Sequence, residues 1–201
     1  MPTLTRLLAA ITALSAWLGL GLQFYDSMQR LHNPLAAVWV LAIYFTVITN
    51  FIVALAFTAT MLERHLHPRL LGGVVLAMTL VGGVYHLLLR NVPIIGGPAA
   101  HYANFFFHTT TPILVVLFWV ACTPKGRLHW IDAAWWPLYP LAYLVYALIR
   151  GSYTHIYPYF FIDVSKIGMA DSLRNAAGIT FAFVVVSLVL IAIDRTGKSR
   201  T

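Results

Sequence analysis

Long apolar runs alternate with short polar turns along the whole chain of 201 residues. An apolar run of about 20 residues is long enough to cross a bilayer as a helix. Runs of roughly this length lie at residues 7–24, 35–62, 70–89, 102–121, 133–149 and 174–193. Turn-forming residues separate them, such as "HNP" at 32–34, "HPR" at 67–69 and "NVPIIGGP" at 91–98. The pattern predicts an all-α polytopic membrane protein, with one transmembrane domain of six helices over residues 1–201.

Basic residues divide unevenly between the two sides of such a bundle. An even number of spans places both termini on the same side of the membrane. That side carries eight basic residues: Arg6, Arg64, Arg69, Lys125, Arg127, Arg195, Lys198 and Arg200. The opposite side carries five: Arg30, Arg90, Arg150, Lys166 and Arg174. Because cytoplasmic loops are enriched in lysine and arginine, this bias predicts that both termini are cytoplasmic.

The composition excludes soluble domains and nucleic-acid-binding proteins. Hydrophobic residues make up 60% of the chain and charged residues 9%, whereas soluble domains carry about 25% charged residues. The basic residues are spread over the turns, so no segment has the basic density of a nucleic-acid site. The single cysteine, Cys122, excludes an internal disulfide. The first apolar run is longer than that of a signal peptide and lacks a clear cleavage site, so we expect it to be retained.

Polar residues recur at helical spacing inside two of the predicted spans. In the second span Thr46, Thr49 and Asn50 share one face, and in the fourth span His101, Asn104, His108 and Thr111 do so. Lipid offers these groups no hydrogen-bond partners, so the two polar faces should turn toward each other or toward a wet cavity. Both helices run inward from the outer side, and Thr46 and His108 lie at depths within about 8 Å of each other. A contact between these two side chains is therefore geometrically plausible.

His108 is the strongest candidate for chemistry. Threonine and asparagine commonly join membrane helices by hydrogen bonds, which is an ordinary packing role. An imidazole in the sequence "NFFFHTTTPI" is different, because ionisable groups inside a membrane are functional candidates. Pro112 lies four residues later and has no backbone N–H to donate to the His108 carbonyl, so we expect a kink beside the histidine. Transmembrane prolines also occur without any chemical role.

Three segments carry a resemblance to a known family. "YFTVITN" (44–50), "NFFFHTTTPILV" (104–115) and "LIRGSYTHIYPYFFIDV" (148–164) resemble the androgen-induced-gene/ADTRP family of multi-pass membrane hydrolases. The bacterial relatives called Pr6Pr membrane proteins look closest. The similarity covers most of the chain in span order. It implies a multi-pass protein of the bacterial inner membrane.

Members of that family hydrolyse fatty acid esters of hydroxy fatty acids with a threonine nucleophile and a histidine. The resemblance places these roles on Thr46 and His108, and the family asparagine four residues before the histidine on Asn104. The family Tyr-Pro of the last outer loop matches Tyr157 and Pro158. The chain departs from the family at Thr49 and Asn50, where animal members can carry an acidic residue.

The residues themselves allow the same chemistry. A threonine hydroxyl attacks an ester efficiently only when a base removes its proton, and a neutral histidine can accept it. Asn50 and Asn104 each lie one turn from a reacting residue, so they could steady the oxyanion or orient the imidazole. Thr49 is a further candidate for orienting the substrate, and His155 and Tyr157 could cap a lipid pocket. This hypothesis needs no metal ion or other cofactor, and its partners are membrane lipids and a lipid ester.

Two other functions remain open. His86 and His108 on adjacent helices could be the axial ligands of a b-type haem. A small lipid transporter or lipid-binding protein could use the same polar groups without turnover, although transporters often show repeated halves and none is evident here.

Overall fold

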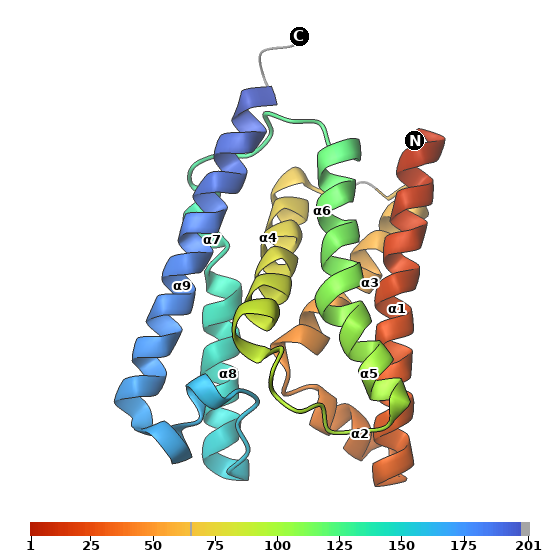
Figure 1. Cartoon of the computed structure of the whole chain (residues 1–201). Helices are drawn as coiled ribbons and strands as arrows, with labels where there is room; N and C mark the ends of the chain where they lie inside the picture. The colour runs from red at the N-terminus through yellow and green to blue at the C-terminus, as the bar shows by residue number, and fades with distance from the viewer. Residues whose placement is uncertain (65, 198–201) are drawn as a thin grey trace. The chain divides into compact units, whose positions relative to one another are not determined.

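The computed structural model describes residues 1–64 and 66–197, and every regular element in these ranges is helical (Figure 1). The all-α prediction is therefore confirmed. The chain forms two compact units, one of residues 1–42 and 46–124 and the other of residues 43–45 and 125 onward. One transmembrane domain over residues 1–201 stays a prediction. Lys198 and Arg200, counted above for orientation, lie outside the described residues.

The first unit contains most of the predicted spans. Its elements are α1 (Thr3–Leu31), α2 (Pro34–Leu41), α3 (Phe45–Met61), α4 (Pro68–Val84), η1 (Tyr85–Leu89), α5 (Pro98–Phe105), η2 (Phe106–Thr110) and α6 (Thr111–Cys122). The short segments η1 and η2 are π-helical. They continue α4 and join α5 to α6, so two long helices cover residues 68–89 and 98–122 (Figure 1).

Helices of this unit begin where the proline-containing turns predicted them. Pro34, Pro68 and Pro98 each occupy the first helical position, where the fixed φ suits a helix and no N–H is needed. The side chain of Asn33 accepts a hydrogen bond of 3.0 Å from the Ala36 backbone N–H and so caps α2. The expected breaks at 32–34, 67–69 and 91–98 are confirmed.

The predicted span over residues 35–62 is two helices, not one. α2 and α3 are bent by 102° at residues 42–44, although this break contains no proline or glycine. In the second unit, the Tyr143 hydroxyl donates a hydrogen bond of 2.7 Å to the Ile43 carbonyl. The Phe45 ring lies with its centroid 5.0 Å from each of the Tyr139 and Tyr143 rings. These contacts from residues far along the chain hold the bend.

The exterior of α1 is more apolar than its buried face. Its exposed positions include Leu4, Leu7, Ile11, Leu14 and Leu18. Its buried positions are small or polar: Ala9, Thr12, Ala13, Ser15, Ala16 and Gly19. Small residues allow close approach of helices in a membrane, while large apolar side chains face lipid. α1 packs on this small-residue face against α5, η2 and α6.

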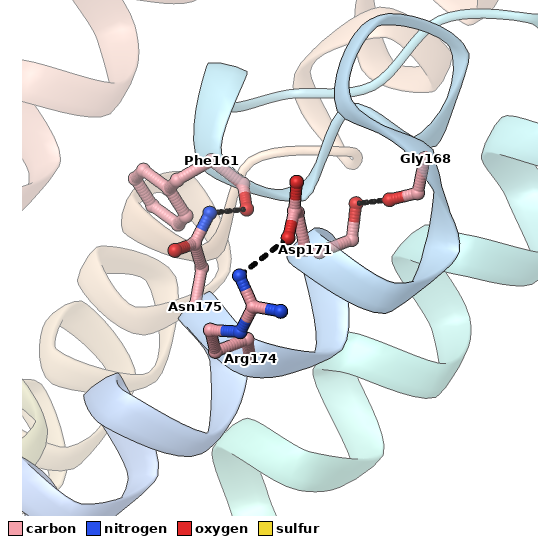
Figure 2. A network of polar contacts seen from close by, with 6 residues as sticks. Phe161, Gly168, Asp171, Arg174 and Asn175 are labelled. Carbon is pink, nitrogen blue, oxygen red and sulfur yellow. Dashed lines mark hydrogen bonds and ion pairs between the residues drawn. The ribbon is translucent and has the colours of Figure 1, made fainter.

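The second unit contains α7 (Asp132–Trp135), α8 (Leu138–Thr154), η3 (Phe160–Ile162) and α9 (Val164–Thr196). α9 starts ten residues before the predicted span at 174–193 and changes direction at Gly168, whose φ of 77° is in the region that favours glycine. Figure 2 shows the next turns of α9, where the Asn175 amide donates to the Phe161 carbonyl over 3.0 Å and Arg174 pairs with Asp171 at 2.7 Å.

Within residues 1–64 and 66–197, four helices are long and apolar enough to cross a membrane: Thr3–Leu31, Pro68–Leu89, Pro98–Cys122 and Val164–Thr196. The bent pair of α2 and α3 makes five if it counts as one span. These helices indicate a multi-pass integral membrane protein.

Candidate active site

Thr46 and His108 lie in contact in the first unit. The Thr46 Oγ1 atom is 3.3 Å from His108 Nε2. Thr46 is the second residue of α3, directly after the bend, rather than eleven residues into a straight span as expected. The predicted contact between α3 and the His108 segment is therefore present, but the bend places the threonine at the start of a helix. Thr46 is 8% exposed and His108 is half-buried.

The second ring nitrogen of His108 fixes the tautomer. Its Nδ1 atom lies 3.0 Å from the backbone carbonyl oxygen of Asn104. A carbonyl oxygen can only accept, so Nδ1 must carry the hydrogen and donate it. Nε2 then has a free lone pair and accepts a hydrogen bond from the Thr46 hydroxyl. This arrangement suits proton transfer from the threonine to the histidine.

His108 occupies the middle of η2, where the helix widens by one residue. The Thr111 backbone N–H donates to the Phe106 carbonyl, five residues back rather than four. Pro112 follows and has no N–H for the His108 carbonyl, so the ordinary helical register is interrupted here. Thr111 was expected on the His108 face, but its hydroxyl lies 2.8 Å from the Ser15 hydroxyl of α1. The kink expected from Pro112 takes the form of a π-helical turn.

Tyr85 also contacts His108, although the helical spacing of polar residues does not predict this contact. In η1, the ring of Tyr85 stacks on the His108 ring with centroids 4.0 Å apart and planes at 16°. The Asn104 side-chain amide donates a hydrogen bond of 2.6 Å to the Tyr85 hydroxyl. The sequence predicts that the Asn104 amide steadies the oxyanion or orients the imidazole; in the structure it is the backbone carbonyl of Asn104 that contacts the imidazole. A tyrosine at the end of an apolar run is typical of a membrane-interface anchor, so nothing in the local pattern indicates this contact.

Asn50 supports the threonine from one turn away. Its Nδ2 atom donates a hydrogen bond of 2.9 Å to the Thr46 backbone carbonyl. The side chain is fully buried, and its Oδ1 atom has no hydrogen-bond partner among the described residues. Thr49 is also buried in α3, at 1% exposure. The structure thus brings together Thr46, Asn50, Asn104 and His108.

His155 and Tyr157 belong to the second unit. His155 is exposed and ends α8 in a left-handed conformation with φ of 55°. The Tyr157 ring covers Gly151 so closely that a Cβ atom there would clash with it. The expected role of both residues at a lipid pocket stays a prediction.

The two histidines proposed as haem ligands have other partners in this arrangement. Both ring nitrogens of His108 are engaged as described above. His86 Nε2 lies 3.3 Å from the Thr109 hydroxyl. No group of three or more histidine, cysteine, aspartate or glutamate side chains within residues 1–64 and 66–197 is placed to hold a metal ion.

Comparison with known proteins finds no matching family model, no matching curated protein and no matching solved structure.

Proposed function

We propose that this membrane protein hydrolyses lipid esters, with Thr46 as the nucleophile and His108 as the general base. The observation that carries the proposal is the 3.3 Å contact between Thr46 Oγ1 and His108 Nε2. The Asn104 carbonyl supports it by holding the proton on Nδ1, which leaves Nε2 ready to accept. A base whose other nitrogen is fixed by a third group is a recurring feature of activated nucleophiles.

The first half of the reaction forms an acyl-enzyme. The Thr46 Oγ atom attacks the ester carbonyl carbon while His108 Nε2 takes the hydroxyl proton. The tetrahedral intermediate collapses, the bond to the alcohol oxygen breaks, and His108 returns the proton to that oxygen. The alcohol leaves, and the acyl group remains esterified to Thr46.

The second half releases the acid. A water molecule attacks the acyl carbon while His108 Nε2 takes one of its protons. The bond to Thr46 Oγ breaks, and His108 returns the proton to the threonine. One ester and one water are thus converted to one acid and one alcohol, and both side chains regain their starting state.

The substrate class follows from the resemblance to the androgen-induced-gene/ADTRP and Pr6Pr proteins. If the chain shares their activity, it cleaves fatty acid esters of hydroxy fatty acids or similar lipid esters. Such molecules dissolve in the acyl chains of a bilayer.

The proposal includes six spans, cytoplasmic termini and location in a bacterial inner membrane. The bent pair of α2 and α3 supplies one span, and α8 with the preceding α7 supplies another. α8 has 17 residues, which is at the lower limit of about 17–25 residues for a transmembrane helix. The excess of basic residues on the terminal side gives the orientation.

A serine/threonine-hydrolase activity probe tests the nucleophile. Thr46→Val preserves shape but removes the hydroxyl, and His108→Ala removes the base. We expect both to reduce probe labelling and ester hydrolysis by at least about 100-fold, because general base catalysis contributes about 10²–10⁴-fold. Thr46→Ser should retain measurable labelling, since it keeps a hydroxyl.

Matched variants control for folding. Thr79→Val removes a threonine hydroxyl that bonds only to the Val75 carbonyl of its own helix. His101→Ala removes an exposed histidine on α5. Both should label like the wild type. Full labelling of Thr46→Val and His108→Ala would exclude the mechanism, and lipid binding without ester cleavage would favour a transporter or lipid-binding protein.

A further inference from the structure

Two π-helical turns meet at the proposed site. η1 continues α4 and carries Tyr85, and η2 lies between α5 and α6 and carries His108. In each, a backbone N–H reaches a carbonyl five residues back: Arg90 to Tyr85 in η1 and Thr111 to Phe106 in η2. Single π turns are uncommon and often occur at functional sites. Here η1 supplies the Tyr85 ring and η2 supplies the His108 ring, and these two rings stack on each other.

The Tyr85 ring restricts the imidazole. Its centroid lies 4.0 Å from that of His108, and the two planes differ by 16°. An imidazole rotates readily about its bond to Cβ, and a half-turn would place Cδ2 where Nδ1 lies and Cε1 where Nε2 lies, so that both the Asn104 and the Thr46 contacts would be lost. A flat ring against one face removes most of the intermediate orientations. The ring plane in which Nε2 points at Thr46 is thereby favoured.

The Tyr85 hydroxyl acts on the same histidine through Asn104. The Asn104 amide donates to this hydroxyl at 2.6 Å, and the backbone carbonyl of the same asparagine accepts from His108 Nδ1 at 3.0 Å. Tyr85 therefore contacts both the His108 ring and Asn104, the residue that accepts the hydrogen bond from His108 Nδ1. These two contacts come from one side chain on a separate helix.

We propose that Tyr85 is the positioning residue of the site, which holds the His108 imidazole in the orientation and tautomer that accept the Thr46 proton. This inference rests on the proposed hydrolase function for its consequence in catalysis. The positioning of the His108 ring by stacking on Tyr85 does not itself require that the protein turn over a substrate. Tyr85 itself takes no part in bond making.

Three substitutions of Tyr85 separate the contribution of its ring from that of its hydroxyl. Tyr85→Phe keeps the stacked ring and loses only the bond from Asn104, so we expect hydrolysis within about threefold of the wild type. Tyr85→Leu removes the flat ring, and Tyr85→Met removes it while keeping a similar volume. We expect both to lower kcat at least about tenfold with little change in KM, because positioning serves the reacting geometry rather than substrate binding. Tyr102→Leu, at an exposed tyrosine of α5, is the matched control and should leave kcat unchanged.

Nitrogen NMR of ¹⁵N-histidine-labelled protein in detergent micelles provides a readout without substrate. The chain has eight histidines, and the His108 signals are assigned by their loss in His108→Ala. In the wild type we expect one fixed tautomer with a protonated Nδ1 and an unprotonated Nε2. In Tyr85→Leu and Tyr85→Met we expect averaged signals from exchanging tautomers, and Tyr85→Phe should restore the fixed pattern.

The two measurements distinguish failure of the inference from failure of the proposed function. A fixed tautomer and wild-type kcat in the folded Tyr85→Leu or Tyr85→Met variant would overturn the positioning role. If no lipid ester is cleaved by the wild type, the hydrolase function fails, and the NMR comparison alone decides whether Tyr85 fixes the ring. Should Tyr85→Leu fail to fold, Tyr85→Met supplies the same comparison.

Discussion

At the scale of single residues, the threonines show what distinguishes a functional group from a packing group. Thr12, Thr60, Thr79 and Thr180 each donate to the backbone carbonyl four residues earlier in their own helix. Such bonds satisfy a hydroxyl in lipid without any partner helix. The Thr46 hydroxyl contacts an imidazole supplied by another helix, as the Thr109 hydroxyl contacts that of His86. The Thr46–His108 pair has in addition a fixed tautomer, because His108 Nδ1 donates to the Asn104 carbonyl and leaves Nε2 as the acceptor.

Asp163 gives a prediction about stability and pH. This buried residue precedes α9, and its pKa is lowered by the hydrogen bond from the Ser165 hydroxyl and by the neighbouring Lys166, while burial opposes the shift. A carboxyl whose pKa is lowered in the folded state stabilises the fold at pH values above its pKa in the unfolded state, 3.8. This contribution is lost as the pH falls through the pKa of the folded state. We expect Asp163→Asn to lower the free energy of unfolding at pH 7 by about 1 kcal/mol, which lowers the thermal midpoint.

The difference in stability between Asp163→Asn and the wild type should narrow as the pH falls through the lowered pKa of the folded carboxyl, because the wild-type side chain then becomes neutral as well. Thermal unfolding in detergent at pH 7 and pH 3 measures this. Asp171→Asn is the control, since its pair with Arg174 has both side chains more than half exposed (Figure 2) and exposed pairs contribute little. A difference that is the same at both pH values would contradict the assignment.

At the scale of elements, local sequence signals predicted the starts of helices but not their irregularities. The helices beginning at Pro34, Pro68 and Pro98 follow from a proline that fixes its own φ. The 102° bend before Thr46 depends on Tyr139 and Tyr143, almost a hundred residues away, so no local pattern could indicate it. Pro112 signalled a disturbed register near His108, but not that η1 on another helix would be π-helical as well.

The same limit applies to the candidate site. Helical spacing was enough to place Thr46 and His108 on faces that meet, because a polar stripe in lipid has few places to turn. The contact between Tyr85 and His108 could not be predicted in this way. It depends on the π register of η1 and on contacts between helices, which spacing within one helix cannot show.

Packing between α4 and α6 leads to a prediction with a matched control. A Cβ atom on Gly82 would lie 3.3 Å from the Pro112 Cβ and 3.4 Å from the His108 carbonyl oxygen, whereas a Cβ on Gly83 would meet nothing within 4 Å. Gly82→Leu should therefore force α4 away from the His108 turn and destabilise the protein by about 1–3 kcal/mol. Gly83→Leu should change stability little, since it adds a side chain in open space.

Probe labelling and thermal unfolding of the two glycine variants are measured together. We expect Gly82→Leu to lose most labelling even at temperatures where it remains folded, because the displaced turn carries the base. Equal labelling of Gly82→Leu and Gly83→Leu would mean that the site does not depend on this close approach.

At the scale of the whole molecule, the number of crossings decides the topology. In the part of the chain that the structure describes, four helices are long and apolar enough to cross a membrane by themselves. The proposed six-span topology needs two further crossings, by the α2–α3 pair and by the 17-residue α8. Each alternative moves particular loops to the other side of the membrane. If the bent pair re-enters without crossing, the loop at Glu63 joins the side of residues 32–33. If α8 does not cross, the loop at Ile156 lies on the same side as residues 123–131.

Single cysteines in a Cys122→Ser background measure these positions. We expect cysteines at Glu63 and Lys125 to react with a membrane-impermeant thiol reagent only after the cells are opened, and cysteines at Val92 and Ile156 to react in intact spheroplasts. Glu63, Val92 and Ile156 are exposed, so each site is reachable from its own side. A Glu63→Cys that reacts in intact spheroplasts while Val92→Cys does not would make α2–α3 a re-entrant hairpin, because every later loop then changes side. An Ile156→Cys that stays unreactive while Val92→Cys reacts and Glu63→Cys and Lys125→Cys do not would remove the crossing by α8. Either result alone would place the two termini on opposite faces and end the six-span proposal.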